Sequence, residues 1–178
     1  VAAGDVVVGL PSLGLQTNGY TLARKVFFEE MGLLPTDRLK ELGGRSVGDA
    51  LLDPHLSYLK PLEPLLAERL VHAMAHLTGG GFYDNIPRVL PKGLGVRLDL
   101  ARIPVLPVFR WLAATGGVAE AEMLRTFNCG IGMIAVVEPA KADAVMAILK
   151  AAGETVVRLG EVVPATDPRF GDYQANAA

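Results

Sequence analysis

Short apolar runs alternate with amphipathic stretches along most of this chain. Runs rich in β-branched and aliphatic residues predict buried strands at 6–10, 71–77, 95–100 and 131–137, with one or two more within 155–163. Apolar positions at helical spacing predict helices near 19–31, 47–52, 61–70, 82–89, 107–115, 120–127 and 139–152. This order predicts an α+β fold in which a mixed β-sheet is layered with α-helices.

Capping and turn residues mark the ends of these elements. Thr17 or Asn18 is expected to cap the first helix, and Pro61 is expected in the first turn of the helix at 61–70. Phe109 and Trp111 are expected to lie in the core. The polar, aperiodic end of the chain predicts one domain over residues 1–163 and a loose tail over 164–178.

Composition narrows the classes of function. A length of 178 residues corresponds to about one domain. The 17 basic and 19 acidic residues give a net charge of −2, which argues against a nucleic-acid partner. No apolar run is long enough for a membrane span, so no membrane partner is expected. The single cysteine, Cys129, indicates a reducing, cytoplasmic location and is expected to be a buried structural residue rather than a nucleophile.

The strongest local motif is Thr78-Gly79-Gly80-Gly81, between a predicted strand and a predicted helix. Three successive glycines carry no Cβ, so their N–H groups can converge on an anion, and Thr78 adds a hydroxyl. The motif matches neither the Walker A loop nor the dinucleotide-binding glycine pattern. A phosphate cradle and an ordinary tight turn both stay open as interpretations.

Polar residues nearby could complete such a site. Asn85 and Arg88 share a helix face and could offer an amide and a guanidinium to the same anion, the alternative being a solvated face. The segment 12–19 is a second loop-to-helix turn, which an ordinary helix start would also explain. His76 would lie at the mouth of the glycine turn. His72 shares its strand, but no third ligand is near, so no metal site is expected.

Several motifs in a fixed order carry a family resemblance. These are Pro11-Ser12, Gly14-Leu15, Thr17-Asn18-Gly19-Tyr20 with Leu22, Ala75-His76-Leu77-Thr78-Gly79-Gly80-Gly81, Asn85-Ile86-Pro87-Arg88-Val89-Leu90-Pro91, Glu122-Met123 with Arg125-Thr126-Phe127-Asn128 and Gly130-Ile131-Gly132-Met133, and the closing segment 148–163 with Gly153 and Gly160-Glu161-Val162. Together they resemble the C-terminal domain of phosphoribosylformylglycinamidine cyclo-ligase, the aminoimidazole ribonucleotide synthetase family. The resemblance implies that family's partly ferredoxin-like fold. Because the chain starts at Val1 rather than Met, we expect it to be part of a longer enzyme.

The resemblance also implies a reaction and its partners. The family closes the imidazole ring of formylglycinamidine ribonucleotide with ATP and Mg²⁺, both bound mainly by an N-terminal domain that also forms a homodimer. Nothing in this chain looks like that domain, so the chain alone is expected to be inactive. The implied catalytic residues are His76 and Asn128. The implied substrate- or phosphate-binding residues are Ser12, Gly14, Asn18, Thr78, Gly79, Gly80, Gly81, Asn85 and Arg88.

Two positions depart from the family pattern. Leu13 stands where a serine is usual and Gln16 where a histidine is usual, so this chain has no hydroxyl and no titratable ring there. Two alternatives to the cyclo-ligase therefore stay open. One is a non-catalytic phosphate-binding domain. The other is a related ATP-dependent enzyme, such as formylglycinamidine ribonucleotide synthetase, selenophosphate synthetase, a hydrogenase-maturation carbamoyl dehydratase or thiamine-phosphate kinase.

Overall fold

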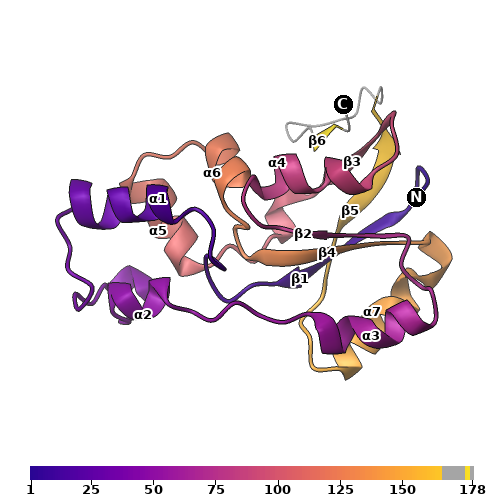
Figure 1. Ribbon diagram of the computed structural model, residues 1–178, viewed down its shortest axis with the longest axis horizontal. Helices are drawn as coiled ribbons and strands as arrows, with labels where there is room; N and C mark the ends of the chain where they lie inside the picture. Colours follow the sequence, from indigo (N-terminus) through magenta and orange to yellow (C-terminus); the bar gives the residue numbers. More distant parts are fainter. Residues whose placement is uncertain (166–174, 177–178) are drawn as a thin grey trace.

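One β-sheet with helices on both faces forms the body of the molecule (Figure 1). The computed structural model describes residues 1–165 and 175–176. The strands are β1 Val6–Pro11, β2 Ala73–His76, β3 Leu94–Leu98, β4 Ile131–Val137, β5 Val157–Pro164 and β6 Ala175–Asn176. The α-helices are α1 Tyr20–Arg24, α2 Val47–Leu51, α3 Leu59–Ala67, α4 Gly81–Asn85, α5 Pro107–Thr115, α6 Glu120–Thr126 and α7 Ala142–Ala151. The α+β class is thus confirmed.

The strands are ordered β2-β4-β1-β5-β3-β6. Every pairing among the described residues is antiparallel, so the sheet is not mixed as we expected. The physical reason lies in the strand order: β1, β2 and β3 run in one direction and β4 and β5 in the other, and strands of opposite direction alternate across this part of the sheet. The long central strands β1 and β4 pair from Val6 with Val137 to Pro11 with Ile131.

Alternation along the central strands produces two apolar cores. Val6, Val8 and Leu10 face α3 and α7, where they join Leu65 and Val145. Val7 of β1, together with Ile134 and Val136 of β4, faces the larger core that α1, α2, α4, α5 and α6 cover. Figure 1 shows α3 and α7 below the sheet, α4 and α6 above it, and α1 and α2 beyond its end. The predicted core residues Phe109 and Trp111 are buried, as expected.

Three local predictions are wrong. Neither Thr17 nor Asn18 caps the first helix: both side chains donate to the carbonyl of Gln16, and Gly19 with φ of 75° precedes the helix instead. After Arg24 this helix continues as a π-helical turn over Lys25–Glu30.

The other two errors concern the bounds of a helix and the tail. The helix predicted at 61–70 is α3, which begins two residues earlier and ends three residues earlier; Pro61 lies in its first turn as expected, and Pro64 lies inside it, where it can donate no N–H. Within the predicted tail, Pro164 closes β5 and Ala175–Asn176 pair with Gly95 and Val96, so these residues belong to the sheet. Residues 166–174 and 177–178 of that tail lie outside the described residues.

Candidate functional site

The glycine motif forms the turn between β2 and α4. Gly80 and Gly81 have φ of 94° and 54°, and the Gly81 N–H donates to the Thr78 carbonyl at 3.0 Å. A Cβ on Gly81 would lie 2.1 Å from the carbonyl oxygen of Leu124 in α6. Gly81 is therefore required both by its left-handed backbone and by the close approach of α6. Gly79 is different, because its Cβ position meets only the Asn18 Oδ1 at 3.5 Å.

Asn85 stabilises this turn through hydrogen bonds to its backbone carbonyls. Its buried Nδ2 donates to the carbonyls of Gly81 at 2.7 Å, Gly79 at 3.2 Å and Thr78 at 3.3 Å. The Arg88 guanidinium donates in turn to the Asn85 Oδ1 at 3.2 Å. Asn85 and Arg88 thus lie together beside the glycine turn, as the sequence suggested. Because the Asn85 amide is occupied by the backbone, its contribution is to position the loop.

A groove of about 460 Å³ opens in front of the turn. Its walls come from the glycine turn, from α1 and the π-helical turn, and from α6, and it is lined by Gly19, Thr21, Leu22, Lys25, Gly79, Gly80, Glu122, Arg125 and Thr126. Among the described residues, the backbone N–H groups of Gly79 and Gly80 donate to no acceptor. Exposed N–H groups of this kind form anion-binding concavities.

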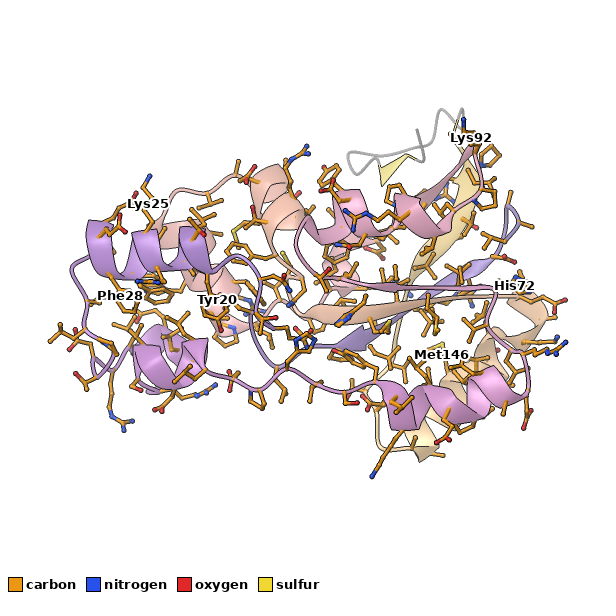
Figure 2. The ribbon with its side chains drawn as sticks, viewed as in Figure 1. Tyr20, Lys25, Phe28, His72, Lys92 and Met146 are labelled. Carbon is orange, nitrogen blue, oxygen red and sulfur yellow. The ribbon has the colours of Figure 1, made fainter. Side chains whose placement is uncertain are left out.

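Two cations stand beside these N–H groups. Lys25 lies 3.5 Å from Glu30 and is 60% exposed, so this weak ion pair leaves its ammonium free to turn toward a ligand. The Arg125 guanidinium stacks on the Tyr83 ring at 4.9 Å from its centroid, and Arg125 lines the groove. Figure 2 shows Lys25 on the outer side of its helix. The groove therefore offers two free amides and two cations to an anionic group.

The other predicted site residues lie under or beside this groove. Ser12 donates to the Asn128 Oδ1 at 2.7 Å, and the Asn128 Nδ2 donates to the Gly14 carbonyl at 2.9 Å. Ser12 and Asn128 are buried, and Gly14 packs on Asp53, so this group ties the loop after β1 to the turn before β4. Of the first loop's predicted residues, only Asn18 reaches Gly79.

His76, the last residue of β2, faces the helix α3 side of the sheet and contacts a second histidine. Its Nε2 lies 3.0 Å from the Nε2 of His55, on the segment between α2 and α3. Burial, and then the neighbouring His55, lower the pKa of His76 below its ordinary value. Among the described residues, no three His, Cys, Asp or Glu side chains gather around one point.

The remaining sequence features have structural roles. Cys129 is buried, and burial raises the pKa of its thiol to about 12, so it lacks thiolate character. Gln16, which stands where the family pattern has histidine, is buried and donates to the Tyr58 hydroxyl at 3.0 Å. Leu13, in place of the usual serine, is 46% exposed.

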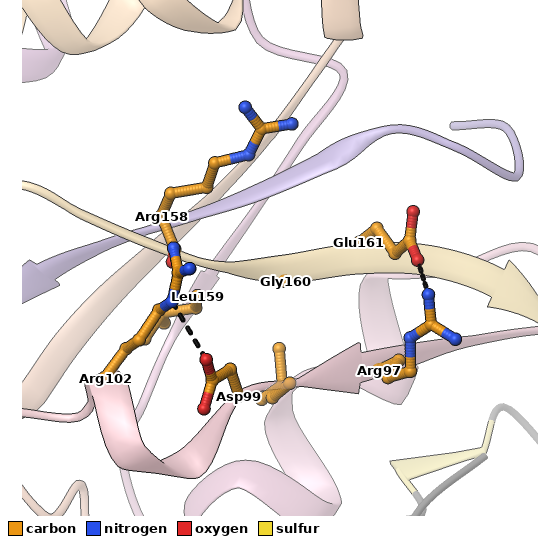
Figure 3. Close-up of a pocket in the computed structure, with 8 residues that line it drawn as sticks. Arg97, Asp99, Arg102, Arg158, Leu159, Gly160 and Glu161 are labelled. Carbon is orange, nitrogen blue, oxygen red and sulfur yellow. Dashed lines mark hydrogen bonds and ion pairs between the residues drawn. The ribbon is translucent and has the colours of Figure 1, made fainter. Parts of the chain in front are cut away.

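A second hollow lies at the other end of the sheet, between β3 and β5 (Figure 3). Arg97 pairs there with Glu161, and Arg102 pairs with Asp99 at 2.9 Å. Figure 3 shows Arg158 pointing away from both pairs, so the cations do not converge on one point. Since carboxylates already hold two of the three guanidiniums, this hollow is a weaker anion site than the groove.

Sequence reasoning missed the groove's side chains. Thr21 and Lys25 were not expected there, and Glu122 and Arg125 entered only as parts of a family motif. Their positions depend on α1 and α6 meeting the glycine turn in space. A basic residue at helical spacing after the loop 12–19 was the only signal for Lys25.

These features define a class: an α+β domain whose glycine-rich strand-to-helix turn stands over a cationic groove. The model of the family "AIR synthase related protein, C-terminal domain" matches residues 2–172. The chain belongs to this family.

Solved structures support the same fold. A hydrogenase maturation protein HypE has a TM-score of 0.64 and 18% identity, over 98% of this chain and 48% of that one. HypE of E. coli has a TM-score of 0.58 and 25% identity, over 92% of this chain and 45% of that one. PurL of T. maritima, solved with AMPPCP, has a TM-score of 0.52 and 17% identity, over 99% of this chain and 26% of that one. The chain thus spans about half the length of the HypE chains it matches.

No helix in the described ranges, 1–165 and 175–176, combines the length and apolarity needed to cross a membrane.

Proposed function

We propose that this chain is the C-terminal domain of an ATP-dependent enzyme that closes the imidazole ring of formylglycinamidine ribonucleotide, and that its groove binds a phosphate group of the reaction. The observation that carries this proposal is the pair of free N–H groups at Gly79 and Gly80, in a groove that Lys25 and Arg125 also line. The family motifs around Asn85–Pro91 and Arg125–Met133 favour the cyclo-ligase over its relatives.

The chemistry explains why such a groove is needed. An amide oxygen is a poor leaving group, and phosphorylation by ATP makes it a good one before a nitrogen of the same substrate attacks the carbon. The protein must therefore hold phosphate-bearing groups in place and balance their charge. Fixed backbone N–H groups do this without side-chain reorganisation. In this proposal Gly79 and Gly80 bind the phosphate, while Asn85 positions their loop.

ATP and Mg²⁺ require residues beyond this groove. The groove suits a phosphate group, but the described residues gather no carboxylate cluster for Mg²⁺. We therefore assign most of the nucleotide and metal binding to an N-terminal domain, which would also form a homodimer. This chain's residues would bind the substrate phosphate in the groove, whereas His76 lies outside it.

A second candidate is a hydrogenase maturation function. The specific observation that favours it is the 25% identity with E. coli HypE over 92% of this chain. The groove would then hold a phosphate in a different ATP-dependent reaction of the same family. Since both candidates use the same anion site, only the substrate separates them.

Turnover tests the proposal and separates the candidates. In the intact protein that contains residues 1–178, formylglycinamidine ribonucleotide should trigger the release of ADP and phosphate. Losing a charge-assisted hydrogen bond weakens binding by about 1.5–3 kcal/mol, so Arg125→Ala should raise the substrate KM by roughly ten- to a hundredfold. The matched control is Arg158→Ala in the second hollow, which should leave KM unchanged. Binding without turnover would indicate a binding module, and no response to the ribonucleotide would contradict the cyclo-ligase.

A further inference from the structure

A pair of histidines from distant parts of the chain meets outside the groove. The Nε2 atoms of His55 and His76 lie 3.0 Å apart, and their ring centroids lie 5.0 Å apart at 65°. His55 is exposed and His76 half-buried, so solvent reaches the pair. Two ring nitrogens at this distance need something between them, because two lone pairs, or two N–H groups, would repel each other.

The Thr17 hydroxyl lies between two possible partners. It donates to the Gln16 carbonyl at 2.5 Å and lies 3.5 Å from the His55 Nδ1. With the Thr17 hydrogen on Gln16, this contact favours the His55 tautomer that carries hydrogen on Nδ1 and presents a lone pair on Nε2. This is the tautomer in which histidine binds a metal, with its other nitrogen fixed by a neighbouring group. Without a metal, the His76 Nε2–H donates to that lone pair.

The spacing of the two nitrogens matches a metal centre. With metal–nitrogen bonds of about 2.0–2.1 Å, two nitrogens lie about 2.9 Å apart at a right angle and about 3.3 Å apart at a tetrahedral angle. The observed 3.0 Å falls between these values.

The surroundings hold the pair in place. Tyr58 meets the His76 ring edge-on at 6.0 Å between centroids, and its hydroxyl is fixed by Gln16 and the Pro11 carbonyl. Gln16 and Thr17 have φ of 53° and 65°, a left-handed backbone that non-glycine residues rarely adopt. Strained backbone of this kind is found where surrounding contacts maintain a site.

We propose that His55 and His76 form a binding site for a divalent transition-metal ion of the copper, nickel or zinc type. Because no third His, Cys, Asp or Glu joins the pair among the described residues, water completes the coordination. On binding, the His76 hydrogen moves from Nε2 to Nδ1, and the ion takes its place between the rings. The order of divalent affinities predicts that Cu²⁺ binds more tightly than Zn²⁺ or Ni²⁺. This proposal does not depend on the phosphate groove.

Metal titration tests the site. Untagged protein is titrated calorimetrically with Cu²⁺ and then Zn²⁺ in the presence of a weak competing chelator, and electron paramagnetic resonance of bound Cu²⁺ reports nitrogen ligands. We expect one ion per chain. His55→Gln and His76→Gln should each lower the affinity at least about tenfold, as loss of a metal-binding interaction does. Thr17→Val should lower it less, through the tautomer alone.

His72→Gln is the matched control. His72 pairs with Asp5 at 2.8 Å, and Figure 2 places it at the far end of the molecule from Tyr20 and Lys25. This variant should keep the wild-type affinity and the nitrogen signal. The proposal is overturned if the His55 and His76 variants bind Cu²⁺ as tightly as the wild type, or if His72→Gln abolishes binding. One ion per two chains would overturn it too, since the ligands would then come from two copies.

Discussion

Asn85→Asp replaces the amide donor behind the glycine turn with a carboxylate oxygen and adds a negative charge beside the Arg88 guanidinium. The side-chain volume stays the same, and the Oδ1 that accepts from Arg88 is kept. The oxygen that replaces Nδ2, however, faces the carbonyl oxygens of Thr78, Gly79 and Gly81. The turn therefore loses the hydrogen bonds from Asn85, and the new carboxylate oxygen faces three carbonyl oxygens in a buried site.

The size of the effect follows from the distances. The bond to Gly81 at 2.7 Å is well formed, whereas those at 3.2 and 3.3 Å are longer and weaker. With about 1 kcal/mol for the short bond, less for each long one, and about 1 kcal/mol or more for the uncompensated polar atoms, we expect a loss of roughly 3 kcal/mol in the free energy of unfolding. For a domain of this size that lowers Tm by roughly 6–12 °C.

Urea unfolding and a phosphate titration of the folded variant measure the two consequences. Affinity for phosphate should fall along with stability, because the turn that positions Gly79 and Gly80 is loosened. Arg88→Gln is the control: it leaves the three carbonyl bonds intact and should change stability by no more than about 0.5 kcal/mol. If Asn85→Asp is as stable as the wild type, the Asn85 hydrogen bonds do not stabilise this turn and the reasoning is refuted.

Four further predictions concern other parts of the molecule. Gly81→Ala should destabilise the protein by more than about 2 kcal/mol in urea unfolding, because of its positive φ and its contact with α6, whereas Gly79→Ala should cost under about 0.5 kcal/mol; equal effects would contradict the loop geometry. Cys129 should react with Ellman's reagent at pH 8 only after unfolding, and rapid reaction in the native protein would refute its burial. Phe27 stacks on Trp111 at 4.1 Å, so Phe27→Ala should cost about 3–5 kcal/mol and shift the tryptophan fluorescence; an unchanged spectrum would count against the stacking. The pKa of His76 is lowered in the folded protein, so its contribution to stability is present above the ordinary histidine pKa and is lost as pH falls toward the folded pKa. His76→Gln should therefore flatten that part of the curve of unfolding free energy against pH. An unaltered slope would show that His76 is not its cause.

How far the sequence predicts the fold depends on how local the signal is. Helix α5 and strand β4 begin and end at the predicted residues, because Pro107 and a continuous apolar run mark them clearly. The first helix was misread at its start, since a left-handed Gly19 replaced the side-chain cap that Thr17 and Asn18 suggested. The antiparallel pairing was also missed, because it depends on which strands become neighbours, and strands far apart in sequence pair here.

The same difference between local signals and long-range packing applies to the candidate site. The glycine turn and its neighbour Asn85 lie within one short segment, so their proximity could be predicted. Lys25 and Arg125 come from helices far away in sequence, and only packing brings them to Gly79 and Gly80. The contact of His55 with His76 spans 21 residues and a loop whose path no periodicity describes.

Phosphate binding at the glycine turn is the central claim, and amide chemical shifts test it most directly. Nuclear magnetic resonance of the ¹⁵N-labelled chain during a titration with inorganic phosphate and then AMP follows each backbone N–H separately. We predict that the largest shifts fall on Gly79 and Gly80, with smaller ones at Lys25 and Arg125, and that Arg125→Ala weakens them. Shifts absent from the turn, or concentrated around Arg158 at the other end of the sheet, would contradict the account.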